Sequence, residues 1–361
     1  DLFFGGDIAA NASKWTSLAK TLKFRMYVQT RKVDGSAAAS AQAIVTEGDF
    51  LTDNFAFQYG TNLANPDSRH PNYSNDYDNG GNTYQSNYFM QLMIDGEGGL
   101  SDPRLRYYFY RQTLENTDDV NEQSCITFNA PDHFSASDPF CQLADGYWGR
   151  DHGDDAGIPP DDFLRTIYGV YPFGGIFDSD QGEGGSQGAG AGGLGVNPFM
   201  MSFYVNFLRA EAALTMGTAD DAATQLEAGI RGSISTVISY GPNDPGYAAV
   251  QATLEPTMDN IDNYVNAVMT EFNSAGGAEA QLEIVIREYF KAAFGNGIEV
   301  YNAYRRTGYP NDVQPSLVEA SGEFIRTFFY PAVFVTRNQN ASQKADVSTL
   351  VFWDDGSINL R

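Results

Sequence analysis

The sequence is short of positive charge. It contains 22 Lys and Arg residues against 46 Asp and Glu, which gives a formal net charge of −24 and a pI near 4.3. Such a chain repels the phosphates of nucleic acids and the headgroups of anionic lipids, and no basic cluster offsets that repulsion. The composition therefore excludes nucleic acid and anionic lipid surfaces as partners.

Long apolar runs are missing as well. No stretch approaches the roughly 20 consecutive apolar residues that a membrane-spanning helix requires. No signal-peptide pattern opens the chain, which starts at Asp1. With 42% hydrophobic and 14% aromatic residues, the chain still has enough apolar side chains for a large core. These features predict a globular protein with one large domain or two closely packed ones.

Residues that carry nucleophilic catalysis are scarce. The chain has three His and two Cys, and it contains no Gly-x-Ser-x-Gly turn. Neither cysteine follows a known nucleophile motif. A carboxylate pair could hydrolyse glycosidic bonds, but the sequence does not give the separation of any such pair. The absence of a nucleophile, a metal triad or a cofactor fingerprint favours binding over catalysis.

The two cysteines, Cys125 and Cys141, flank a short loop. In an oxidising compartment this arrangement suits a disulfide bond that closes the loop. Two unpaired thiols that behave as small apolar side chains are the alternative. The sequence leaves both alternatives open.

Apolar residues recur at three- and four-residue spacing in several stretches, which is the pattern of amphipathic helices. The clearest helix is Leu282–Phe294, in which Arg287, Glu288 and Lys291 occupy the face opposite the apolar residues. We also expect Asn197-Pro198 to open a long helix that carries Phe199 on its inner face. The same pattern predicts further helices at Trp15–Gln29, 36–46, Ser202–Met216, Ala222–Ser239 and 258–274.

These helices are expected to pair as antiparallel hairpins over residues 14–46, 199–239 and 258–294. The W-x-x-L-A pattern that starts at Trp15 is typical of a tetratricopeptide hairpin. Residues 48–197 are instead rich in loops, and the chain after 310 is expected to be extended. The sequence predicts a mainly α fold, with tetratricopeptide-like helical hairpins, an irregular loop-rich lobe and a few short strands.

The loops between residues 48 and 100 interleave aromatic residues with Asn and Asp. Tyrosine rings can stack on sugars or peptide side chains, while amides and carboxylates bond hydroxyl groups. Alternatively, each tyrosine only pins a surface loop to the core. With that alternative open, the candidate ligand-binding residues are Tyr73, Tyr77, Tyr84, Tyr88 and Trp148.

The densest acidic cluster lies between Trp148 and Asp162. Closely spaced oxygen ligands suit Ca²⁺, although the spacing is not that of an EF-hand loop. The alternative is that these aspartates cap turns and helix starts. Asp151, Asp154 and Asp155 are therefore a candidate calcium site, and no other cofactor is expected.

The most specific motif is YNAYRRTGYP at residues 301–310, directly after the helix at Leu282–Phe294. Other motifs follow the same order along essentially the whole chain: GD…W (Gly6, Asp7, Trp15), DPRL (Asp102–Leu105), WGRDHGDDAGIPPD (Trp148–Asp161), LRAEAAL (Leu208–Leu214), FFYP (Phe328–Pro331) and FWDDG (Phe352–Gly356). Together they resemble the signature of SusD-like (SusD/RagB) outer-membrane nutrient-binding lipoproteins of Bacteroidota.

The resemblance implies a single SusD-like domain over residues 1–361. Its helical scaffold would cover about 1–47 and 198–310, its ligand lobe about 48–197, and an extended C-terminal segment 311–361. The resemblance also implies that a lipoprotein signal, an anchoring Cys and further helices precede Asp1. Membrane contact would then be made only through that N-terminal lipid anchor, at the surface of the outer membrane.

The resemblance further implies a non-catalytic subunit that caps a SusC-like TonB-dependent outer-membrane barrel and presents nutrients to it. The aromatic and Asn-rich loops lead us to expect an oligosaccharide ligand. Peptide binding within the same family is the first alternative. An all-helical polysaccharide hydrolase or lyase is the second.

Overall fold

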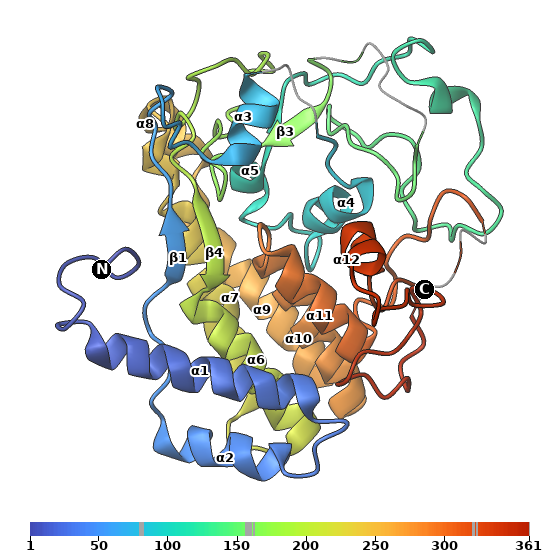
Figure 1. The fold of residues 1–361 in the computed structure, drawn as a ribbon. Helices are drawn as coiled ribbons and strands as arrows, with labels where there is room; N and C mark the ends of the chain where they lie inside the picture. The colour runs from blue at the N-terminus through green and yellow to red at the C-terminus, as the bar shows by residue number, and fades with distance from the viewer. Residues whose placement is uncertain (79–82, 156–160, 162, 320–321, 323, 361) are drawn as a thin grey trace.

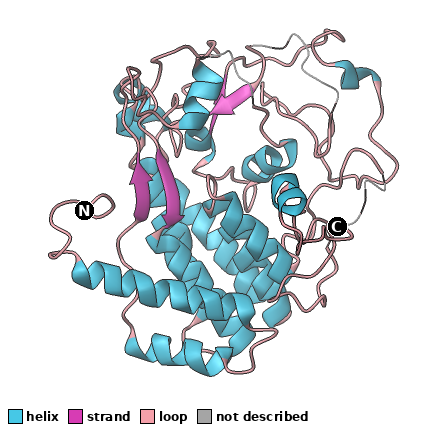
Figure 2. Cartoon of the chain, viewed as in Figure 1, coloured by secondary structure: helices cyan, strands magenta, loops and turns pink. Residues whose placement is uncertain are grey.

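The computed structural model describes residues 1–361 except 79–82, 156–160, 162, 320–321, 323 and 361 (Figure 1). Helices dominate the fold, and the strands that accompany them are short, as Figure 2 shows. The predicted mainly α fold class is confirmed. No helix in the described part of the chain is both long and apolar enough to cross a membrane.

The expected helical hairpins are present, with ends that differ from the predicted ones by at most four residues. The paired helices are α1 (Ala12–Thr30) with α2 (Ala37–Glu47), α6 (Ser202–Met216) with α7 (Ala222–Ile238), and α9 (Met258–Ser274) with α10 (Ala278–Ala292). Helix α10 also packs against α6 and α7, so the second and third hairpins share one hydrophobic core.

The last scaffold helix, α11 (Gly297–Thr307), is fixed by a buried arginine. Arg306 donates two hydrogen bonds of 2.7 Å to the carboxylate of Glu211 in α6. Arg31, which follows α1, reaches the same carboxylate at 3.0 Å. The second arginine of YRRTGYP and the glutamate of LRAEAAL therefore meet in one ion cluster, which joins α11, α6 and the end of α1.

The lobe between the scaffold segments contains two short antiparallel strand pairs: β1 (Phe55–Gln58) with β4 (Val196–Met200), and β2 (Phe109–Arg111) with β3 (Thr166–Tyr168). Its helices are α3 (Pro71–Tyr77), α4 (Asn87–Asp95), α5 (Leu105–Tyr108), the 3₁₀ turn η1 (Ser124–Thr127) and, after α7, η2 (Gly241–Asn243) and α8 (Tyr247–Leu254).

Two predictions about secondary structure are wrong. Asn197-Pro198 does not open a helix, because both residues lie in β4, and Phe199 is 42% exposed instead of facing the core. A residue before proline is driven towards extended backbone, which favours the strand. After residue 310 the chain is not extended throughout, since α12 (Ala332–Arg337) interrupts it.

A buried ion network joins the lobe to the scaffold. Arg104 donates to Asp102 at 2.6 Å and to Glu288 of α10 at 3.4 Å. On the same helix, the Nζ of Lys291 lies 2.8 Å from Glu288 and 2.9 Å from Glu97 of the lobe. The DPRL motif, which supplies Asp102 and Arg104, thus contacts α10, the helix that the sequence predicts most clearly.

The charged residues of α10, which lie opposite its apolar residues, are expected from this pattern to face solvent, and the network shows that two of them do not. Glu288 and Lys291 are fully buried, because α9 and the lobe segment around Glu97 cover that side of the helix. Burial lowers the pKa of Lys291, but Glu288 and Glu97 outweigh it and hold that pKa above its ordinary value. The charged side of the helix is a polar contact surface inside the protein, and it is not exposed to solvent.

Candidate functional site

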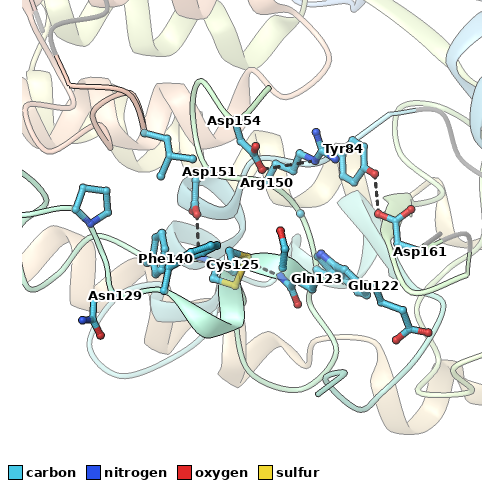
Figure 3. A pocket seen from close by; sticks show the side chains of 17 residues that line it. Tyr84, Glu122, Gln123, Cys125, Asn129, Phe140, Arg150, Asp151, Asp154 and Asp161 are labelled. Carbon is cyan, nitrogen blue, oxygen red and sulfur yellow. Dashed lines mark hydrogen bonds and ion pairs between the residues drawn. A yellow bond between two sulfur atoms is a disulfide. The ribbon is translucent and has the colours of Figure 1, made fainter. Parts of the chain in front are cut away.

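Two neighbouring cavities, one in the lobe and one between the lobe and the scaffold, share Tyr84 in their walls. The disulfide cavity encloses about 450 Å³ (Figure 3), and its wall includes Gln123, Cys125, Phe128, Cys141, Trp148 and Arg150. The aromatic cavity encloses about 310 Å³ between α4 and the end of α10, and its wall includes Tyr88, Phe89, Tyr168, Phe290 and Phe294. Both volumes fall in the range of small-molecule sites.

A disulfide bond forms one wall of the first cavity. Cys125 and Cys141 are bonded, with Cα atoms 5.5 Å apart, which settles the alternative that the sequence left open. The bond closes the loop that carries η1, and Phe128 and Phe140 of this loop line the cavity. The disulfide thus links two segments of the cavity wall covalently.

Tyr84 separates the two cavities. Its hydroxyl donates to Asp161 at 2.6 Å, and burial, helped by this carboxylate, raises the pKa of Tyr84 to about 12. The guanidinium of Arg150 lies 3.8 Å from the ring centroid, and that of Arg165 lies 4.7 Å from it. Because two arginines already pack on the ring, Tyr84 serves as a dividing wall and not as a free stacking surface.

Tyr88 and Trp148 line one cavity each. Tyr88, on α4, is almost fully buried, and its hydroxyl donates to Asp312 at 2.9 Å. Trp148 is also mostly buried and lines the disulfide cavity. The structure therefore brings three of the five predicted aromatic residues, Tyr84 included, to the two cavities.

Tyr73 and Tyr77 have no face open to a ligand, so the prediction for these two residues is corrected. Their rings stack at 4.4 Å in a small core with Ile167. Their hydroxyls donate to the backbone carbonyls of Ala189 and Tyr168. Buried tyrosines whose hydroxyls bond to backbone carbonyls hold a loop against the core, which is the alternative given above for these tyrosines.

The three candidate calcium ligands do not form a ligand set. Asp151 is buried and accepts hydrogen bonds from the side chains of Asn87 and Gln314 and from the backbone N–H of Cys141. Asp154 lies 3.8 Å from Arg150, and Asp155 is exposed. Within the described ranges, no group of three or more His, Cys, Asp or Glu side chains is placed to hold a metal ion. Asp151 instead anchors the loop beside the disulfide.

The sequence reasoning missed two residues of the disulfide cavity. Phe128 is 66% exposed although it lines a cavity, which is unusual for a large apolar ring. Gln123 is almost fully buried beside it. Both belong to residues 112–146, which show no periodicity. The only signal in the sequence was their position, since Phe128 lies between the two cysteines and Gln123 lies two residues before Cys125.

The comparisons with known proteins agree with the fold. Residues 197–360 match the model of the SusD-like family, described as Susd and RagB outer membrane lipoprotein. A SusD homologue from Bacteroides fragilis is 18% identical, with a TM-score of 0.61 over 98% of this chain and 69% of that one. A homologue from Parabacteroides distasonis is 17% identical, with a TM-score of 0.56 over 100% and 68%. The chain is thus SusD-like in its fold, and its residues 197–360 match the SusD-like family.

A solved chitin-binding protein is 19% identical to this SusD-like chain, with a TM-score of 0.57 over 94% of the chain and 62% of that protein. The SusD-like chain spans only 58% of the length of another SusD homologue from Bacteroides fragilis. No protein with a curated description matches it. At these identities the likeness shows the fold, so ligand and partner must be argued from the site.

Proposed function

We propose that this SusD-like chain is a non-catalytic, cell-surface subunit that binds oligosaccharides in the two cavities around Tyr84. The observation that carries the proposal is Phe128, an exposed ring at a cavity of about 450 Å³ whose wall also presents amide and carboxylate groups, among them those of Gln123 and Glu122. Such a ring can pack on the apolar face of a sugar while the polar groups bond its hydroxyls.

Binding without catalysis is favoured by the way the carboxylates of the site are used. Asp151 accepts three N–H donors, and Asp161 pairs with Arg165 at 2.8 Å and accepts from Tyr84. A glycosidase needs one carboxyl group that is free to donate a proton to the leaving oxygen. Asp151 and Asp161 are committed to holding the loops together.

A peptide is the second candidate ligand. The aromatic cavity favours it, because Phe89, Phe290 and Phe294 give this cavity an apolar wall that suits a peptide side chain. Including peptides in the same binding panel separates this candidate from an oligosaccharide.

Replacing Phe128 by Ala is expected to weaken oligosaccharide binding by about 1–3 kcal/mol, the range of an aromatic anchor. The matched control is Phe352→Ala, because Phe352 is 86% exposed and lines neither cavity. Isothermal titration against a panel of glycans and peptides measures both variants, and chromatography of the mixtures checks for cleaved products. Equal affinity of both variants for every glycan would contradict the proposed site, and cleavage products would reveal an enzyme.

The partner in this proposal is a SusC-like TonB-dependent barrel in the outer membrane, on which the chain sits as a lid. Exposed apolar side chains mark surfaces that contact another protein. The C-terminal segment exposes such side chains at Phe328, Phe329, Val333, Phe334 and Phe352.

The barrel is expected to copurify with this protein from detergent-solubilised outer membranes. A permanent seat on the barrel should bury more than about 2,000 Å² and so survive purification. Substituting Phe328 and Phe329 by Ser should release the barrel, whereas the Phe128→Ala variant should retain it. If the protein purifies alone from these membranes at every salt concentration, the lid is refuted and a free-standing surface binder replaces it.

A further inference from the structure

Gln123 has one amide atom without a partner. Its side chain is only 5% exposed, and its Nε2 donates to the carbonyl oxygen of Cys141 at 2.6 Å. This bond fixes the orientation of the amide, since a flipped group would set Oε1 against another oxygen. Among the described residues, Oε1 has no donor, although Gln123 lines the disulfide cavity. A buried acceptor of this kind is costly unless a ligand supplies the missing donor.

The disulfide cavity is also strongly negative. Among the residues that the structure describes, four carboxylates and one guanidinium line it, those of Glu122, Asp151, Asp154, Asp161 and Arg150. Even when the charge of Arg165, which pairs with Asp161, is added, four negative and two positive charges leave −2 at the site. The whole chain, at −24, adds a field of the same sign. Cations are attracted into such a cavity, and carboxylates are repelled from it.

We infer that the disulfide cavity selects oligosaccharides that carry protonated amino groups and rejects those built from uronic acids. The inference rests on the proposed function and specifies its ligand class. An ammonium group offers three donors. One donor satisfies the Oε1 of Gln123 and the others face the carboxylates, while the sugar ring packs on Phe128. A neutral sugar can supply a hydroxyl donor, but its binding gains nothing from the charge.

The direct test compares three β- or α-linked tetrasaccharides by isothermal titration: a glucosamine tetramer, cellotetraose and a galacturonic acid tetramer. The pH is set so that the amino groups are protonated. In low salt, the glucosamine tetramer is expected to bind at least about tenfold more tightly than cellotetraose, a difference of roughly 1.4 kcal/mol. The galacturonate tetramer should show no binding. Added salt should shrink the gap, because it screens the charges.

Two substitutions that each remove one negative charge, at different places, locate the effect. Glu122→Gln removes one charge from the cavity wall, whereas Glu227→Gln removes one from α7 in the scaffold. Both variants have the same net charge, so they differ only in where the charge is lost. Glu122→Gln should weaken glucosamine tetramer binding several-fold and leave cellotetraose unchanged, and Glu227→Gln should alter neither.

The outcomes separate the two proposals. If cellotetraose binds as well as the glucosamine tetramer, or the uronic acid binds best, the amino-sugar preference is overturned while oligosaccharide binding stands. If Glu122→Gln and Glu227→Gln behave alike, the preference does not arise in this cavity and the inference fails. If no oligosaccharide binds at all, the proposed function fails and the inference falls with it.

Discussion

Replacing Lys291 by Met is expected to lower the free energy of unfolding by about 3–5 kcal/mol, the cost of leaving a buried charge without its partner. Lys291 is fully buried on α10, and its Nζ contacts Glu288, Glu97 and the hydroxyl of Tyr264. Methionine fills a similar volume, so the loss of charge and not a cavity dominates the effect.

Within the described residues, the network around Lys291 sets three carboxylates against three cations, and the more exposed Glu271 pairs with one of these cations, Arg287. Asp102, Glu97 and Glu288 face Arg104, Arg287 and Lys291 at distances between 2.6 and 3.4 Å. Removing one cation leaves one carboxylate charge uncompensated in a place from which water is excluded. Because Glu97 and Asp102 come from the lobe, the loss should also loosen the lobe on the scaffold.

Chemical denaturation followed by circular dichroism measures the effect. The matched control is Lys14→Met, which breaks a surface ion pair with Asp53 and is expected to cost no more than about 1 kcal/mol. The double variant Lys291→Met/Glu288→Gln should recover part of the loss, because it removes the unpaired charge as well. If Lys291→Met is no worse than Lys14→Met, the network does not hold the lobe.

The scaffold could be predicted from the sequence because its helices bury one face in a regular period. The predicted Ser202–Met216 has the same bounds as α6, and the predicted Ala222–Ser239 ends one residue beyond α7. The period also gave the apolar side of α10, but it could not give its other side. Charged residues on one face of a helix have the same spacing whether that face is exposed to solvent or is buried against other charged side chains. Only the contacts of Glu288 and Lys291 in the structure show that this face is buried.

The candidate site was less predictable, because loops have no period. Tyrosines that pin a loop and tyrosines that face a cavity occur in the same Asn- and Asp-rich stretch. Tyr73 and Tyr77 differ from Tyr84 in what lies beside the ring. The hydroxyl of Tyr73 bonds to the carbonyl of Ala189 in the Gly-rich segment and that of Tyr77 to the carbonyl of Tyr168 in β3, whereas Tyr84 lines a cavity. These segments are about a hundred residues away in the sequence. Phe128 could not be distinguished from other phenylalanines without the disulfide that positions it.

Removing the disulfide is expected to have the second large effect, on stability and on binding together. In the chain-entropy account, a bond that closes a loop of about 15 residues stabilises a protein by roughly 3 kcal/mol. The bond between Cys125 and Cys141 has a sequence separation of 16, so Cys125→Ala/Cys141→Ala should lose a comparable amount in chemical denaturation. Reduction of the wild-type protein should lower its stability to that of the double variant.

The same change should weaken binding of the glucosamine tetramer by about tenfold, since the loop must then be ordered when the ligand binds. Phe128 and Phe140 lie within the loop that the disulfide closes, and Gln123 donates a hydrogen bond to the carbonyl of Cys141. The disulfide therefore positions both the apolar and the polar part of the cavity wall. Titrations of the wild-type protein with and without reductant measure this effect, and the double variant, which reductant cannot change, is the control. If the reduced wild-type protein binds with undiminished affinity, then the anchoring of Asp151 by Asn87 and Gln314 is enough to hold the wall, and the disulfide stabilises the fold without shaping the site.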